Sequence, residues 1–271
     1  MRHPRLTPLV AVAHGSRDPR AAATVTELLS AVRARAPRRG LSGLDVRAAF
    51  LDHCAPSLPQ VLGSVTADAG APAVVVPLLL TAAYHSKADI PAQLAAAAAA
   101  RPGLDVVSAG TLGPHPLLLA ALERRLREAG AATGDADRTG VVLAAAGSSD
   151  PAANATIAEL AARWARERGW RSVVPAYASA ADPRPAQAVR ALRAGGAETV
   201  VVATYLLAPG YFADKVGEAA RGAGADAVSA VLGAAPEVAD VVLDRYLAAA
   251  SGQGRAARLA SAEPAAAQVR G

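Results

Sequence analysis

The stretch AVAHGSRDP at residues 11–19 ends an apolar run, and it is nearly repeated as LAAAGSSDP at residues 143–151. Both copies carry Gly, Ser, Asp and Pro in register, but Ala146 stands where the first copy has His14. Asp is favoured as the N-cap of a helix and Pro at its first position, which fits Asp18 and Pro19. The pattern therefore predicts a strand followed directly by a helix, present twice in one chain.

Four short apolar runs alternate with Ala-rich helical stretches around the first copy. The runs are LVAVA (9–13), LDVRAAF (44–50), AVVVPLLL (73–80) and LDVVSAG (104–110). Strands this apolar are typically buried on both faces, as in a parallel sheet with helices above and below. Pro77 interrupts the third run, so we expect a sheet edge or an irregularity there.

The same alternation restarts after a polar, Gly-containing segment. Equivalent positions in the two halves are 132, 127 and 127 residues apart, and they pair His14 with Ala146, Asp52 with Ser179 and His85 with Phe212. Three similar separations in the same order indicate an internal duplication, of a size usual for a domain. We expect domains at residues 1–130 and 140–250, a linker at 131–139 and a disordered tail at 251–271, where no apolar period is present.

Candidate ligands for a metal follow three of the predicted strands. His14 comes after the first strand, Asp52 after the second and His85 after the third. Loops at the carboxyl ends of parallel strands converge, so two imidazoles and a carboxylate can surround one divalent ion there. The second half has Ala146, Ser179 and Phe212 instead, so we expect only the first half to carry the chemistry. On an extended segment, His53 should point away from Asp52.

Composition excludes several classes of protein. The net charge is +5, but no basic cluster is interleaved with aromatic residues, which argues against nucleic acid as a partner. The longest apolar segment, residues 73–84, is too short to span a bilayer, and the N-terminus lacks an export signal, so we expect a cytoplasmic protein with no membrane contact. Cys54 is the only cysteine, so neither an internal disulfide nor a thiolate metal site can form.

The motifs HGSRDP (14–19), FLDHCAPSL (50–58) and PLLLTAAYHSKADIP (77–91) resemble the class II, ATP-independent sirohydrochlorin chelatases of the SirB/CbiX type. The resemblance implies an α/β protein of two tandem chelatase-like (flavodoxin-like) domains, each a mainly parallel four-stranded sheet flanked by helices. It also implies a site between the halves in which His14 and His85 flank the macrocycle. The family usually carries Glu where this chain has Asp52. A monomer with internal pseudo-two-fold symmetry is expected.

The implied reaction is insertion of Fe²⁺ or Co²⁺ into sirohydrochlorin, with the metal as substrate and no organic cofactor. A neutral imidazole can bind a metal or accept a pyrrole proton at cellular pH, and the sequence leaves open which histidine does which. No phosphate-binding loop is present, which agrees with independence from ATP. The substrate is a polycarboxylate, so the candidate substrate-binding residues are Ser16, Arg17, Lys87 and His115.

Three alternatives stay open from the sequence. The ligands suit iron, for siroheme, and cobalt, for cobalamin precursors, equally well, and we favour iron. A non-catalytic carrier of tetrapyrrole or metal would use the same cleft. A histidine phosphatase also places His-Gly after a first strand, but it needs Arg directly before the histidine, where this chain has Ala13.

Overall fold

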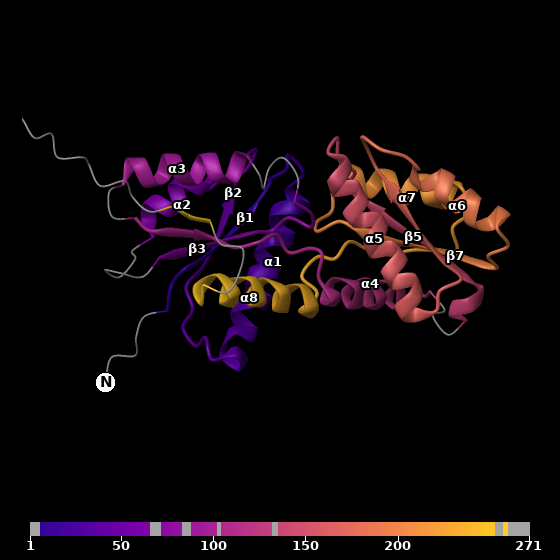
Figure 1. The fold of residues 1–271 in the computed structure, drawn as a ribbon, viewed down its shortest axis with the longest axis horizontal. Coiled ribbons are helices and arrows are strands. Elements are labelled where there is room, and N and C mark those ends of the chain that lie inside the picture. The colour runs from indigo at the N-terminus through magenta and orange to yellow at the C-terminus, as the bar shows by residue number, and fades with distance from the viewer. Residues whose placement is uncertain are drawn as a thin grey trace, which may run out of the picture.

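The computed structural model describes residues 6–65, 72–82, 88–101, 104–131, 135–252 and 257–259. The chain forms two α/β units that lie end to end (Figure 1). Within the described residues, no helix is long and apolar enough to cross a membrane.

The first unit contains a sheet with strand order β2-β1-β3-β4-β9. Its parallel strands are β1 (Leu9–Ala13), β2 (Val46–Phe50), β3 (Ala73–Pro77) and β4 (Val106–Ser108). Pro77 is the last residue of β3, which lies in the middle of the sheet, so the expectation of an edge strand there is wrong. Because the strand ends at this proline, its missing N–H costs little of the ladder.

The second unit repeats this topology with the order β6-β5-β7-β8, all parallel. Its strands are β5 (Thr139–Ala145), β6 (Ser172–Tyr177), β7 (Thr199–Tyr205) and β8 (Ala227–Val228). Each unit thus has four parallel strands in the same order, which confirms the predicted tandem α/β architecture. In both units the strand order reverses beside the first strand of the unit. In such sheets this reversal leaves a crevice at the carboxyl ends of the strands, and ligands bind there.

In the described part of the chain, eight α-helices cover the sheets. They are α1 (Pro19–Arg35), α2 (Leu58–Ser64), α3 (Ile90–Ala100), α4 (Pro116–Glu128), α5 (Pro151–Arg168), α6 (Pro185–Ala194), α7 (Tyr211–Gly222) and α8 (Pro236–Ala250), with short 3₁₀ turns at Ala36–Arg39 and Ala136–Arg138. The predicted start of α1 is confirmed, because the Asp18 side chain accepts a hydrogen bond from the backbone N–H of Arg20 and Pro19 is the first helical residue.

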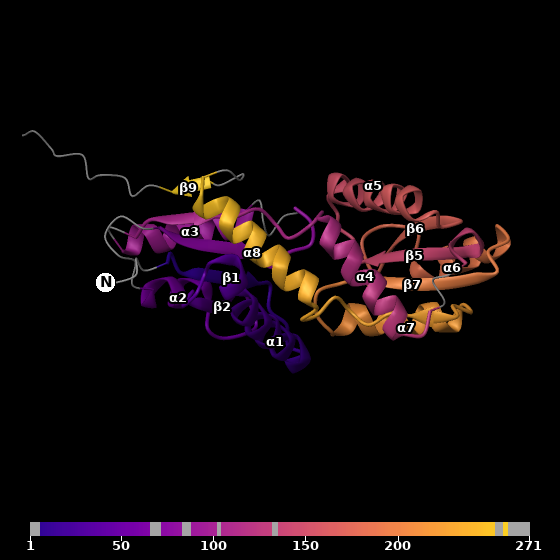
Figure 2. The same cartoon turned by 90° about the horizontal axis from the view of Figure 1, so that it is seen from below.

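The last helix of each repeat packs on the other repeat's sheet. Helix α8 contacts α1 and β3 in the first unit, whereas α4 contacts β7 in the second, and the two helices also contact each other. Figures 1 and 2 show α8 alongside the first sheet and α4 alongside the second. The sequence repeats at 1–130 and 140–250 are therefore not the spatial units, since each unit borrows one helix.

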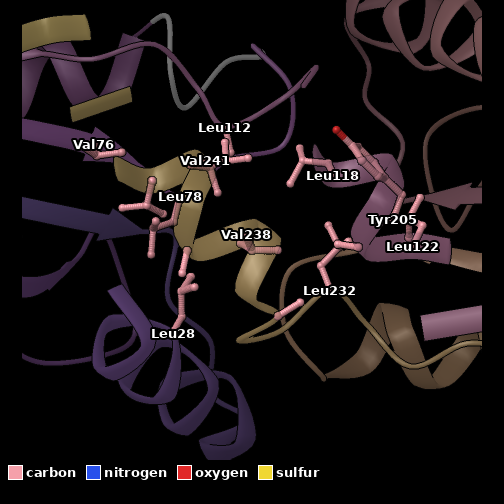
Figure 3. Close-up of a cluster of buried hydrophobic side chains, with 14 of the residues drawn as sticks. Leu28, Val76, Leu78, Leu112, Leu118, Leu122, Tyr205, Leu232, Val238 and Val241 are labelled. Atoms are coloured by element: carbon pink, nitrogen blue, oxygen red, sulfur yellow. The ribbon is translucent and has the colours of Figure 1, made fainter. Parts of the chain in front are cut away.

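The exchange makes one core of the two units. One face of the first sheet packs on α2 and α3, and one face of the second packs on α6 and α7, each through its own cluster of buried side chains. The other two faces share a single continuous cluster, which runs from Leu28 and Leu78 through Val241 to Leu118 and Tyr205 (Figure 3). Hydrophobic burial thus stabilises the two units together.

The expected disordered tail contains one ordered element. Residues Ala257–Leu259 form β9, which pairs antiparallel with β4 at the edge of the first sheet (Figure 2). For these three residues the expectation of disorder is corrected. Backbone pairing with an open sheet edge needs no apolar period, so the sequence pattern gave no sign of it.

Candidate metal and substrate site

The glycine of the repeated stretch is required by the turn that it forms. Gly15 has a φ of 94°, and a Cβ built on it would lie 1.8 Å from the backbone oxygen of Asp52. Gly147 has a φ of 84°, and its Cβ would lie 2.0 Å from the backbone oxygen of Ser179. Only glycine tolerates both the left-handed backbone and this close approach. In each unit the turn therefore packs directly against the backbone that follows the second strand.

The serine and the aspartate of the stretch also form the same hydrogen bond with each other in both copies. The hydroxyl of Ser16 accepts a hydrogen bond from the backbone N–H of Asp18 at 3.1 Å, and Ser148 accepts one from Asp150 at 3.0 Å. What the two copies share is thus the turn and the helix cap. Nδ1 of His14 lies 3.2 Å from the backbone oxygen of Gly15, but the second copy forms the same turn with Ala146 at the equivalent position. The predicted contact of Ser16 with substrate stays a prediction.

Two cavities lie between the units and adjoin at His14. The first, of about 470 Å³, is lined by residues 13–17 of the first unit and residues 206–213 of the second. The second, of about 510 Å³, is lined by residues 78–81 of the first unit and residues 145–149 of the second. His14 lines both cavities, as do Leu78 and Leu206. The carboxyl ends of β1, β3, β5 and β7 therefore converge on one cleft, with an imidazole at its centre.

A buried tyrosine joins the two units beside the second cavity. The hydroxyl of Tyr205, at the end of β7, donates a hydrogen bond to the backbone oxygen of Leu80 at 3.3 Å. Burial raises the pKa of Tyr205, so its hydroxyl keeps its proton and remains a donor. Leu80 belongs to the segment that leads from β3 towards His85. This bond thus fixes the start of that segment against the second unit.

The structure brings His53 to the site, and sequence reasoning missed it. His53 has a φ of 59°, so the segment is not extended and the alternation of side chains does not apply. Its ring lines the first cavity, with its centroid 6.5 Å from that of His14. The expectation that His53 points away from the site is therefore wrong. A positive φ is uncommon outside glycine, so the sequence pattern of an extended segment did not predict it.

Asp52 is turned to His53 and to solvent. One carboxylate oxygen accepts a hydrogen bond from the backbone N–H of His53 at 2.7 Å, and the other lies 3.3 Å from Nε2 of the same residue. Its side chain is 63% exposed and lines neither cavity. The carboxylate can orient the His53 imidazole, but it does not face the cleft directly.

His115 has a structural place away from both cavities. It caps α4, since its Nδ1 accepts a hydrogen bond from the backbone N–H of Leu117 at 3.2 Å, and its Nε2 lies 3.7 Å from Asp244 on α8. Burial, together with the nearby Arg245, lowers the pKa of His115. A neutral imidazole is what the cap requires, because the acceptor nitrogen must carry no proton. The structure does not bring His115 to the other candidates.

Of the three remaining candidates, Arg17 is among the described residues and the other two are not. Arg17 is exposed and lines the first cavity, so its guanidinium can reach an anionic group in the cleft. His85 and Lys87 lie outside the described residues. Within the described part of the chain, no group of three or more His, Cys, Asp and Glu side chains could hold a metal ion. The predicted ligand set of His14, His85 and Asp52 stays a prediction.

Comparisons with known proteins support the architecture and name the family. A sirohydrochlorin cobaltochelatase of Priestia megaterium is 27% identical over 208 residues, which are 76% of this chain and 66% of that one, just under two thirds of its length. A sirohydrochlorin ferrochelatase of Bacillus subtilis (strain 168) is 25% identical over 207 residues, 76% of each chain.

Among solved structures, SirB from Bacillus subtilis with Fe³⁺ superimposes with a TM-score of 0.74 at 23% identity, covering 92% of this chain and 98% of that one. At this identity the match shows a shared fold. The CbiX family model matches residues 8–129 and again residues 140–249, so it covers both repeats. The chain therefore belongs to the CbiX family.

Proposed function

We propose that the chain is an ATP-independent chelatase that inserts a divalent metal, Fe²⁺ in preference to Co²⁺, into sirohydrochlorin. The observation that carries the proposal is the position of His14, at the point where two cavities between the units adjoin. A planar macrocycle held in this cleft would present its pyrrole nitrogens to that imidazole. The names of the relatives, cobaltochelatase and ferrochelatase, support the substrate and the choice of metals.

Insertion replaces two pyrrole N–H protons with one M²⁺, so the products are the metallated macrocycle and two protons. His14 and His85 divide the two tasks of binding the metal and accepting these protons. We assign Asp52 a lesser part, because its carboxylate is directed to His53 and not to the cleft. His53 faces the first cavity beside His14 and is available to the same proton transfer.

The carboxylates of the substrate would pair with cations at the rim of the cleft. Arg17 lines the first cavity and is exposed, and Lys87 follows His85 by two residues. Ser16 lines the same cavity and offers its hydroxyl, which already accepts one hydrogen bond. Charge-assisted hydrogen bonds of this kind are the stronger ones, and they would fix the orientation of the macrocycle.

One chain is proposed to suffice for activity, in the cytoplasm and without nucleic acid or membrane. The second unit supplies the opposite wall of both cavities, so it stands where a partner subunit would otherwise be needed. At the positions equivalent to His14 and His85 it has Ala146 and Phe212. We therefore propose one metal site for each chain.

Turnover distinguishes the enzyme from a carrier. Full-length protein at about one hundredth of the sirohydrochlorin concentration is mixed anaerobically with Fe²⁺ or with Co²⁺, without ATP, and metallation is followed by absorbance. A chelatase converts nearly all of the macrocycle above the uncatalysed rate, with a larger kcat/KM for Fe²⁺. Conversion of no more than one equivalent per chain would contradict catalysis and favour a carrier. A larger kcat/KM for Co²⁺ would reverse the choice of metal.

A further inference from the structure

Two aromatic side chains are exposed at the mouth of the cleft. Tyr211 is 72% exposed and Phe212 is 40% exposed, and they are the only exposed large hydrophobic residues in the described part of the chain. The whole sequence has just two Phe, five Tyr and two Trp. Aromatic side chains contribute most when buried, so leaving two adjacent ones in water indicates that something covers them.

The pair belongs to the wall of the first cavity. Both residues form the start of α7 and line the cavity together with His14, which the second cavity shares. Phe212 holds the position that is equivalent to His85 in the repeat. The second unit has thus exchanged a polar ring that can bind metal for an apolar ring that cannot.

The rings are arranged to contact one flat surface in two ways. Their centroids are 5.6 Å apart and their planes are inclined by 56°, so only one ring can lie parallel to a flat ligand. The other ring then meets that ligand at an inclination, between stacking and edge-to-face contact, the two arrangements that aromatic groups favour. The ammonium of Lys215 lies 5.8 Å from the centroid of the Tyr211 ring, so a cation stands beside the pair.

An ion-pair cluster ties this start of α7 to the first unit. Arg20, on α1, contacts Asp18 and Asp214 at 2.6 Å each, and Asp214 follows Phe212 by two residues. Exposed ion pairs contribute little to stability, but a guanidinium shared by two carboxylates restricts orientation. The wall that carries the aromatic pair is therefore held in place across the mouth of the cleft.

We propose that Tyr211 and Phe212 form a stacking surface for one face of the tetrapyrrole macrocycle, with Lys215 placed for a peripheral carboxylate. A planar conjugated ring is the ligand class that matches two exposed aromatic rings in a cavity with an imidazole. In this arrangement the second unit holds one face of the macrocycle, while the first unit supplies His14 and the cations proposed for the substrate carboxylates. The inference rests on the proposed function, because it takes sirohydrochlorin as the ligand.

The test measures binding of metal-free sirohydrochlorin to the full chain by the change in its absorption spectrum. The double variant Tyr211→Leu/Phe212→Leu keeps apolar bulk and removes both rings. The matched control, Tyr211→Phe/Phe212→Tyr, keeps both rings and exchanges the hydroxyl. We expect Kd to rise about tenfold for the leucine pair and to stay within about twofold for the control, since the contacts of both rings with the macrocycle are lost only in the former.

Turnover and metal binding separate this role from a general structural one. The leucine pair should raise KM for the macrocycle about tenfold while kcat stays within about twofold, because the rings bind the macrocycle and do not themselves bind the metal. Affinity for Co²⁺ alone, measured by titration calorimetry, should not change.

Unchanged Kd and KM in the leucine pair, with a wild type that binds and metallates sirohydrochlorin, would overturn the stacking surface and leave the proposed function intact. A wild type that neither binds nor metallates sirohydrochlorin would instead overturn the proposed function. Sedimentation could instead show that the wild type is a dimer and that the leucine pair is a monomer with an unchanged Kd for sirohydrochlorin. The rings would then contact a second copy of the chain, and this result would also overturn the proposal.

Discussion

Replacement of Leu28 by alanine tests whether the two units unfold as one. Leu28 lies on α1 in the first unit, is fully buried, and belongs to the core cluster that α8 extends into the second unit (Figure 3). Removing a buried leucine side chain typically costs about 2–5 kcal/mol, and because Leu28 is fully buried between packed helices we expect a loss of about 3 kcal/mol here. With a urea m-value of about 3 kcal/mol per M for a chain of this size, the midpoint should fall by about 1 M.

The assay compares two probes of the same urea titration. Both tryptophans, Trp164 and Trp170, lie in the second unit, so their fluorescence reports its unfolding. Trp164 also donates a hydrogen bond to Glu123 on the exchanged helix α4 at 3.0 Å. Circular dichroism at 222 nm reports both units. In Leu28→Ala the two probes should fall together in a single transition, although the change is in the other unit.

A tryptophan midpoint that does not move, beside a dichroism curve that splits into two steps, would refute this reasoning. It would mean that α4 and α8 do not couple the two sheets. Unfolding free energies would then have to be assigned to each unit separately.

Three further predictions each concern a single residue. Asp52→Asn should lower the metallation rate less than tenfold, whereas loss of a general base or ligand costs 10²–10⁴-fold, so a loss above about a hundredfold would make this carboxylate an essential ligand or base. Burial and the nearby Arg245 lower the pKa of His115 below its usual value of about 6.5, so the folded state favours the neutral ring. The stability that this neutral ring contributes is present above about pH 6.5 and is lost as the pH falls below that value. The variant His115→Asn keeps an acceptor for the helix cap, so it should flatten the decline in melting temperature between pH 7 and pH 5. An unchanged slope would contradict this prediction. Gly15→Ala should lose about 3 kcal/mol or more, because its Cβ would collide with the Asp52 carbonyl, whereas Gly40→Ala, with a φ of 74° and open space, should lose only about 1–2 kcal/mol; equal losses in urea unfolding would exclude the clash.

The sequence predicts the fold well where local pattern and repeat agree. The apolar runs and the start of α1 at Asp18 and Pro19 are where the pattern places them, because caps and strand composition act within a few residues. The exchange of α4 and α8 could not be predicted in this way. An amphipathic helix shows that it buries one face, but not which of two similar sheets it covers.

The candidate site was predictable in part, for reasons that individual residues illustrate. His14 follows β1 directly, so its place at the carboxyl end of the sheet depends only on the strand assignment. His53 depends on one left-handed backbone conformation, which the sequence does not encode in a recognisable way. Tyr211 and Phe212 were apparent only from exposure, since an aromatic pair after a strand is usually part of the core.

The central claim is that the cleft around His14 performs metal insertion, and the rate of Fe²⁺ insertion into sirohydrochlorin by His14→Ala tests it most directly. The account predicts a rate at least about a hundredfold below wild type, a similar loss for His85→Ala, and a melting temperature within about 2 °C of wild type, because the equivalent turn around Gly147 forms with Ala146 in place of the histidine. A wild-type rate in His14→Ala would contradict the account, since the two cavities would then meet at a residue without a chemical task.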